Sequence, residues 1–221
     1  MIYDPAVHHR RSIRLQEYDY SQAGAYFVTI CTQNWECLFG KIAEAEMRLN
    51  DAGEMICRWY EELGNKFTNI ECDVFVCMPN HVHFVVVNVG ADLRVRPDCG
   101  SAHPPKGQTH RSAPTDEYES GKHILGEHTG FSLHRAVQWF KTMSTNEYIR
   151  GVKRYGWTPF PGKLWQRNYW EHIVRNESEL NRIREYINNN PVKWDLDKLH
   201  PLTSTGNHET LARYGTEEWM I

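Results

Sequence analysis

The chain has 221 residues, a length typical of one domain, so a single core with one functional site is expected. Hydrophobic residues make up 40% of it and charged residues 24%, which excludes a wholly disordered chain. The net charge of -3 at pH 7 does not by itself indicate a nucleic-acid-binding protein. No apolar run reaches the roughly 18 residues that cross a membrane. The first residues also lack the apolar stretch of a signal peptide, so a cytoplasmic protein is expected.

Positive charge is concentrated in the second half of the chain. Residues 131–193 contain 11 Lys and Arg against 5 Asp and Glu, a net charge of +6 that leaves -9 for the remainder. Such a region can face phosphate groups, although a solvated helix surface explains it equally well. The six cysteines include no Cys-x-x-Cys pair, which argues against a zinc ribbon or a thioredoxin-type site.

The first elements predicted along the chain are a strand and a helix. Residues 25–32 are rich in aromatic and β-branched side chains and predict a strand, with which residues 39–42 are expected to pair. Asn50 or Asp51 suits the N-cap of a helix. Apolar residues recur at helical spacing from there to Gly64, which predicts a helix over this stretch.

Two neighbouring strands are predicted next, followed by a long insertion. Residues 72–78 and 81–88 are β-branched segments separated by a Pro-Asn turn. Residues 90–130 then hold four prolines and six glycines, which is typical of a mobile surface insertion. This insertion contains four histidines whose spacing matches no metal motif, and they are interpreted as loop residues: His103, His110, His123 and His128.

The second half predicts a helix, a strand and a final helix. Ser132 suits an N-cap, and the run that follows it predicts a basic amphipathic helix. Residues 164–174 mix aromatic and β-branched side chains and predict a strand. The last helix is predicted to start after Asn176, with acidic residues in its first turn, and to end before Pro191.

This order of elements predicts an α+β fold. Strands alternate with helices in a way that favours an antiparallel or mixed sheet with helices packed on it. We predict a single domain over residues 1–195, with the insertion at 90–130, and a C-terminal tail over residues 196–221.

The most specific chemical feature is the pair His81 and His83. Side chains two positions apart on a strand share a face, so both imidazoles can point at one divalent ion. A His-x-His pair also fits two histidines that pack beneath a loop and are satisfied by hydrogen bonds.

The last predicted helix offers partners for such a site. Tyr186 and Asn190 lie four residues apart and therefore on one helical face. A carboxamide oxygen can complete the coordination of a hard cation such as Mg²⁺, and a phenol beside it can attack a phosphorus atom held on that ion. Taken alone, Tyr186 also fits a core aromatic and Asn190 a helix-terminal residue before proline.

Four motifs together resemble a known family. YDYSQAGAYFVTICT, MPNHVHFVVV, LWQRNYWEHIVRN and REYINNNPVKW are similar to the single-tyrosine transposases of the HUH nuclease superfamily. The similarity is strongest to the branch associated with repetitive extragenic palindromes. It covers roughly residues 10–195, apart from the insertion. The resemblance implies a ferredoxin-like antiparallel sheet with helices packed on it, which is the HUH nuclease fold.

The resemblance also implies roles for single residues. His81 and His83 correspond to the pair that binds the catalytic metal, Mg²⁺ or Mn²⁺, and Asn190 to a further contributor to the metal site. Tyr186 corresponds to the nucleophile, with Tyr169 as a competitor that lacks a partner ligand one turn later. In the same motif, two residues either line the site or form structural hydrogen bonds: Glu171 and His172.

The implied activity is metal-dependent cleavage and rejoining of single-stranded DNA at hairpins, as in DNA transposition, by a monomer or homodimer. Tyr186 would form a covalent 5′-phosphotyrosine and release a 3′-hydroxyl. We predict DNA contacts for a set of basic and aromatic residues, although surface or packing roles fit them as well: Arg10, Arg11, Arg14, Lys141, Arg150, Lys153, Arg154 and Trp165.

Two other functions remain open. One is a non-cleaving protein, derived from a transposase, that only binds hairpin DNA. The other is a metal-dependent phosphodiesterase that uses water, for which Tyr186 would be dispensable.

Overall fold

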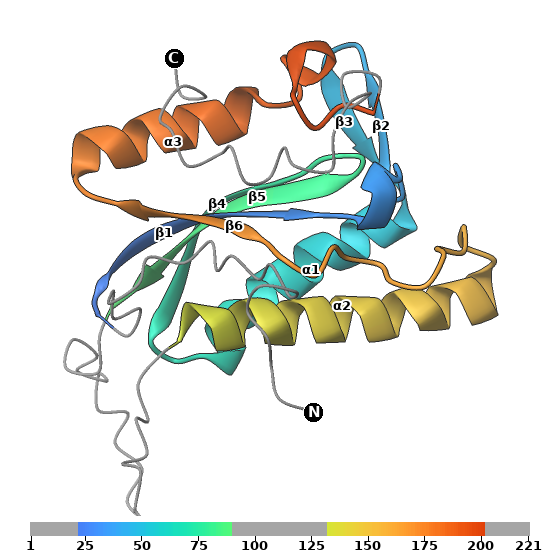
Figure 1. Cartoon of the computed structure of the whole chain (residues 1–221), viewed down its shortest axis with the longest axis horizontal. Helices are drawn as coiled ribbons and strands as arrows, with labels where there is room; N and C mark the ends of the chain where they lie inside the picture. The colour runs from blue at the N-terminus through green and yellow to red at the C-terminus, as the bar shows by residue number, and fades with distance from the viewer. Residues whose placement is uncertain (1–21, 90–131, 202–221) are drawn as a thin grey trace, which may run out of the picture.

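The computed structural model describes residues 22–89 and 132–201, and all statements below concern these residues. A four-stranded antiparallel sheet lies at the centre (Figure 1). Its strand order is β4-β5-β1-β6, with β1 at Gly24–Cys31, β4 at Ile70–Cys77, β5 at His81–Asn88 and β6 at Trp170–Val174. The three α-helices are α1 (Asp51–Lys66), α2 (Leu133–Tyr155) and α3 (Glu177–Asn189).

The connectivity is that of a ferredoxin-like fold. Helix α1 connects β1 to β4, helix α2 connects β5 to β6, and each of these strand pairs encloses a strand of the other pair. Helices α1 and α2 cover one face of the sheet, whereas α3 lies across the other face (Figure 1). The predicted α+β fold with an antiparallel sheet is therefore confirmed.

The alternation of side chains along β1 gives the sheet two apolar faces. Tyr26, Val28 and Ile30 belong to the core beneath α1 and α2. Phe27 points the other way and packs in a second, smaller core with three α3 residues at helical spacing: Leu180, Ile183 and Ile187. Helix α3 is therefore held on the sheet by its own apolar stripe.

The predicted caps of α1 and α3 are present. Asn50 accepts a hydrogen bond from the backbone of Gly53 at 2.9 Å, and Asn176 accepts one from the backbone of Glu179 at 2.9 Å. Ser132 occupies the N-cap position of α2, but its side chain makes no capping hydrogen bond.

One strand-pairing prediction is wrong. Residues 39–42 were expected to pair with β1, yet β2 (Gly40–Ala43) pairs with β3 (Glu46–Leu49) in a separate two-stranded sheet. The reason is a two-residue turn at Glu44 and Ala45, which both adopt positive φ angles and so close a local hairpin.

The predicted strand over residues 164–174 is also too long. Only Trp170–Val174 forms a strand, and Trp165 makes a single isolated bridge to Thr32. The backbone between them is held differently, because Lys141 Nζ lies 2.9 to 3.3 Å from three successive carbonyl oxygens and donates to them: Gln166, Arg167 and Asn168.

The packing of α3 on the sheet contributes to the stability of the fold, and one substitution tests how much. Ile183 is fully buried between α3 and the sheet. Replacing Ile183 by Ala should lower the free energy of unfolding by about 2 to 5 kcal/mol, because it removes buried methyl groups and leaves a cavity. Urea denaturation followed by circular dichroism measures this change. In contrast, Val192→Ala, at a position that is 66% exposed, should change it by no more than about 0.5 kcal/mol.

Candidate active site

The histidine pair lies at the start of β5, on the face that α3 covers. His81 and His83 have the same parity as Val85, which belongs to the core beneath α3. Both side chains are buried, and their ring centroids are 4.5 Å apart. In the tight turn from β4 into β5, the backbone N–H of Met78 donates to the carbonyl oxygen of His81. The two imidazoles that follow this turn therefore lie side by side on one face of the sheet.

Tyr186 reaches this pair from α3. Its Oη lies 3.3 Å from His83 Nε2, and its ring packs edge-on against Phe27 with a centroid distance of 6.1 Å. The other ring nitrogen of His83, Nδ1, lies 2.7 Å from Thr29 Oγ1. Two groups separated by 103 positions in the sequence thus meet, and the proximity expected of His83 and Tyr186 is observed.

Two polar contacts fix α3 over the sheet. Arg184 pairs with Asp73 of β4, with Nη2 to Oδ2 at 2.6 Å. Near the N-terminal end of the helix, Glu179 accepts from the backbone of Arg175 at 2.7 Å and lies 2.9 Å from His172 Nε2. Burial raises the pKa of Glu179, but these hydrogen bonds outweigh it and lower that pKa below its ordinary value.

Asn190 ends α3 close to His81. Its side chain is 3% exposed, and within residues 22–89 and 132–201 its buried Oδ1 has no hydrogen-bond partner. The same holds for His81 Nε2. Burial lowers the pKa of His81 to about 3, and the neighbouring Asn190 side chain acts in the opposite direction. Three predicted metal-site residues, His81, His83 and Asn190, are therefore near one another.

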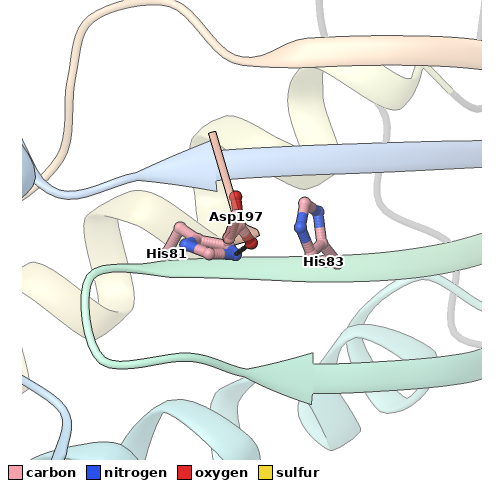
Figure 2. A group of neighbouring side chains, drawn as sticks. All are labelled: His81, His83 and Asp197. Carbon is pink, nitrogen blue, oxygen red and sulfur yellow. Dashed lines mark ion pairs between the residues drawn. The ribbon is translucent and has the colours of Figure 1, made fainter. Parts of the chain in front are cut away.

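Asp197 joins the site and was not predicted. A short 3-10 helix, η2 (Trp194–Leu196), returns the chain toward β5 after α3. Asp197 Oδ2 then lies 3.7 Å from His81 Nε2 (Figure 2). One ligand atom each of His81, His83 and Asp197 fits within 4.8 Å of the others. No spacing motif marks this aspartate in the sequence, so only the folded chain reveals it.

The electrostatics of the cluster suit a divalent cation. Burial, together with the neighbouring His81, lowers the pKa of His83 well below its ordinary value, although Asp197 opposes this shift. Both imidazoles are therefore neutral at neutral pH, which is the form that binds metals. Buried polar atoms without a partner are costly, and a cation would satisfy both His81 Nε2 and Asn190 Oδ1. The donor set of two nitrogens and two oxygens thus fits such an ion.

The competing tyrosine lies on the other face of the sheet. Tyr169 packs against the core beneath α1 and α2, and its ring stacks on His134 with a centroid distance of 6.5 Å. Glu171 is paired with Val28, whose side chain points into the same core. His172 is on the α3 face, but it contacts Glu179. Among the tyrosines of residues 22–89 and 132–201, Tyr186 is thus the one that contacts the histidine pair.

Two predicted DNA contacts are buried. Lys141 is 9% exposed, its Nζ is bonded to backbone carbonyls, and burial lowers its pKa to about 8. Trp165 is 4% exposed, and its Nε1 donates to Ser144 Oγ at 2.9 Å. Its ring packs with Phe39 and Phe140. Since both side chains are covered, we assign them a packing role.

The remaining predicted contacts lie elsewhere. Arg150, Lys153 and Arg154 are exposed at the C-terminal end of α2, in the layer opposite to α3. They therefore do not line the cluster around His81. The three N-terminal arginines, Arg10, Arg11 and Arg14, lie outside the described residues, as does the insertion at 90–130. No helix in the described part of the chain is long and apolar enough to span a membrane.

Comparisons with known proteins agree with the sequence motifs. No protein-family model matches the chain. An uncharacterized protein of Haemophilus influenzae is 34% identical over 207 residues, which cover 90% of this chain and 97% of that protein. A second protein of the same organism, named "Putative REP-associated tyrosine transposase", is 34% identical over 59 residues, or 25% of this chain and 33% of that protein.

Among solved structures, that of a REP-associated tyrosine transposase bound to a REP hairpin aligns with 85% of this chain and 77% of its own, at 16% identity and a TM-score of 0.48. The relationship of this chain to known proteins rests on the two sequence matches. The chain belongs to the same family as the uncharacterized H. influenzae protein, and it is a relative of the REP-associated tyrosine transposases that its four motifs resemble.

Proposed function

We propose that this protein is a metal-dependent single-strand DNA endonuclease and strand transferase that acts at DNA hairpins through Tyr186. The observation that carries the proposal is the 3.3 Å distance between Tyr186 Oη and His83 Nε2, beside a second buried imidazole and a carboxylate. The motif resemblance and the match to a REP-associated tyrosine transposase support DNA as the substrate.

The proposed metal ligands are His81 and His83 through Nε2, with oxygen atoms of Asn190 and Asp197. When bound, a divalent ion such as Mg²⁺ or Mn²⁺ supplies a Lewis acid that neutralises charge on the scissile phosphate. The strand β5 holds the two imidazoles rigidly, because β5 is hydrogen-bonded to β1 on one side and to β4 on the other. A rigid pair lowers the cost of organising the ligands around the ion.

Tyr186 supplies the nucleophile in this proposal. Its Oη attacks the phosphorus in line, forming a bond between the phenol oxygen and the 5′-phosphate as the bond from phosphorus to the 3′-oxygen breaks. The phenol proton passes to water, and the departing 3′-oxygen takes up a proton. Attack by another 3′-hydroxyl on the phosphotyrosine reverses the step and joins new ends, without ATP.

The phenol needs help to react. A free tyrosine has a pKa near 10, so only roughly 0.1% of it is ionised at neutral pH. Packing against Phe27 holds the Tyr186 ring in place, and its Oη is next to a ligand atom of the metal site. A cation held by these residues would favour the phenolate, because opposite charges at short range stabilise the ionised form.

The alternative of a protein that only binds hairpins explains the cluster less well. Binding of a DNA hairpin requires a surface with cationic and aromatic side chains, but it does not require two neutral imidazoles beneath a tyrosine. A water-using phosphodiesterase would employ the same metal site, and would make Tyr186 dispensable.

The deciding experiment incubates the full chain with labelled hairpin DNA and Mg²⁺ or Mn²⁺. A denaturing gel measures cleavage, and mass spectrometry of the digested protein locates any nucleotide adduct. The proposal expects an adduct on the peptide that contains Tyr186. Cleavage with a free 5′-phosphate and no adduct would indicate a hydrolase, and hairpin binding without cleavage would indicate a binding protein.

A further inference from the structure

Asn80 is a fully buried residue whose side-chain amide has three partners. Its Nδ2 donates to the carbonyl oxygen of Leu199 at 2.8 Å and to that of Trp35 at 3.2 Å. Its Oδ1 lies 2.8 Å from His81 Nδ1. Carbonyl oxygens only accept hydrogen bonds, so two of them fix which end of the amide is the nitrogen. The amide orientation therefore follows from chemistry.

This orientation determines the tautomer of His81. Because Asn80 Oδ1 can only accept, His81 Nδ1 must carry the proton and donate it. His81 Nε2 is then the bare nitrogen, and it is the atom that faces Asp197. His83 differs, because both of its ring nitrogens lie beside hydroxyl groups, Thr29 Oγ1 and Tyr186 Oη, which donate or accept. Its neighbours impose no tautomer.

The same amide holds the segment that carries Asp197. The carbonyl oxygen of Leu199 accepts from Asn80, and the backbone N–H of Leu199 donates to Asp197 Oδ1 at 2.7 Å. Asn80 is itself anchored, since its carbonyl oxygen accepts from the backbone and the hydroxyl of Thr32 at 2.8 and 3.0 Å. One rigid residue thus contacts both His81 and the turn after η2.

We propose that Asn80 is a positioning residue that sets the tautomer of His81 and seats Asp197 opposite it, so that both present lone pairs to one divalent cation. This inference deepens the proposed function and rests on its metal site. A ligating histidine that donates its other N–H to a fixed acceptor keeps its ring orientation and gains basicity, and loss of such a partner costs about 10- to 100-fold in metal affinity.

The test compares Asn80→Leu, which removes both functions with a similarly branched but larger apolar side chain, with Asn80→Asp, which keeps the acceptor for His81 Nδ1 but loses the donor to Leu199. The first readout is ¹⁵N NMR of the imidazoles in the metal-free protein. Wild type and Asn80→Asp should show His81 protonated at Nδ1, whereas Asn80→Leu should shift it toward the Nε2 tautomer. Thr29→Val is the matched control, since it alters only the environment of His83 and should leave His81 unchanged.

The second readout is Mn²⁺ affinity, measured by electron paramagnetic resonance. Asn80→Leu should weaken it about 10- to 100-fold, and Asn80→Asp should weaken it less. Wild-type His81 protonated at Nε2 would overturn the proposal even if no variant folds, as would unchanged Mn²⁺ affinity in a folded Asn80→Leu protein. Failure of DNA cleavage in a protein with the expected tautomer and affinity would instead count against the proposed function.

Discussion

Replacing Tyr186 by Phe should abolish cleavage of single-stranded DNA and the covalent adduct, while binding of the hairpin is retained. The substitution removes one oxygen atom and leaves the ring that packs against Phe27. The loss of its contact with His83 costs on the order of 1 kcal/mol of stability at most, because His83 keeps Thr29 as a partner. Loss of a nucleophile has a far larger effect, and we expect the cleavage rate to fall at least about 10³-fold.

The measurement is the initial cleavage rate on a labelled hairpin, with hairpin affinity determined by fluorescence anisotropy in the same buffer. Tyr169→Phe is the matched control, since Tyr169 is a tyrosine of the neighbouring motif whose side chain lies on the opposite face of the sheet. Its cleavage rate should stay close to that of the wild type, because the substitution leaves the reacting groups unchanged. Full cleavage by Tyr186→Phe would leave the water-using phosphodiesterase as the better reading.

Helices and strands could be predicted where apolar residues recur at a clear spacing and a capping residue or proline marks the end of the element. Helix α3 is an example, because Asn176 caps it, its apolar residues recur at helical spacing, and Pro191 follows its end. The shared face of His81 and His83 follows from the two-residue repeat of a strand in the same way. These features depend on neighbouring residues in the sequence, so the sequence contains the information directly.

Features that depend on tertiary packing could not be predicted. The basic periodicity of α2 suggested a DNA contact for Lys141, but its amine turns inward because three backbone carbonyls need a donor there. Trp165 is likewise drawn into the core between β1 and α2. Asp197 enters the site only because η2 turns the chain back toward β5. No local sequence pattern predicts the position that the chain reaches after such a turn.

Removing the metal, either with a chelator or through His81→Ala, should abolish cleavage while hairpin binding remains. Chelation empties the site without changing any side chain, and readdition of Mg²⁺ or Mn²⁺ should restore the activity of the wild type. His81→Ala removes one nitrogen ligand of the cluster, and we expect Mn²⁺ affinity to fall by more than the roughly 10- to 100-fold that loss of a supporting partner costs.

The two arms separate a metal effect from a folding effect. His81 is fully buried and its Nδ1 bonds Asn80, so His81→Ala leaves a buried amide oxygen without its partner and lowers stability by about 1 to 3 kcal/mol. Chelated wild type keeps the hydrogen bond between His81 and Asn80, and equal loss of cleavage in both proteins therefore points to the ion. His134→Ala, at an exposed histidine outside the site, should cut DNA at the wild-type rate. Full activity of the wild type in excess chelator would show that the reaction needs no metal, and the proximity of His81 and Asp197 would then have another role.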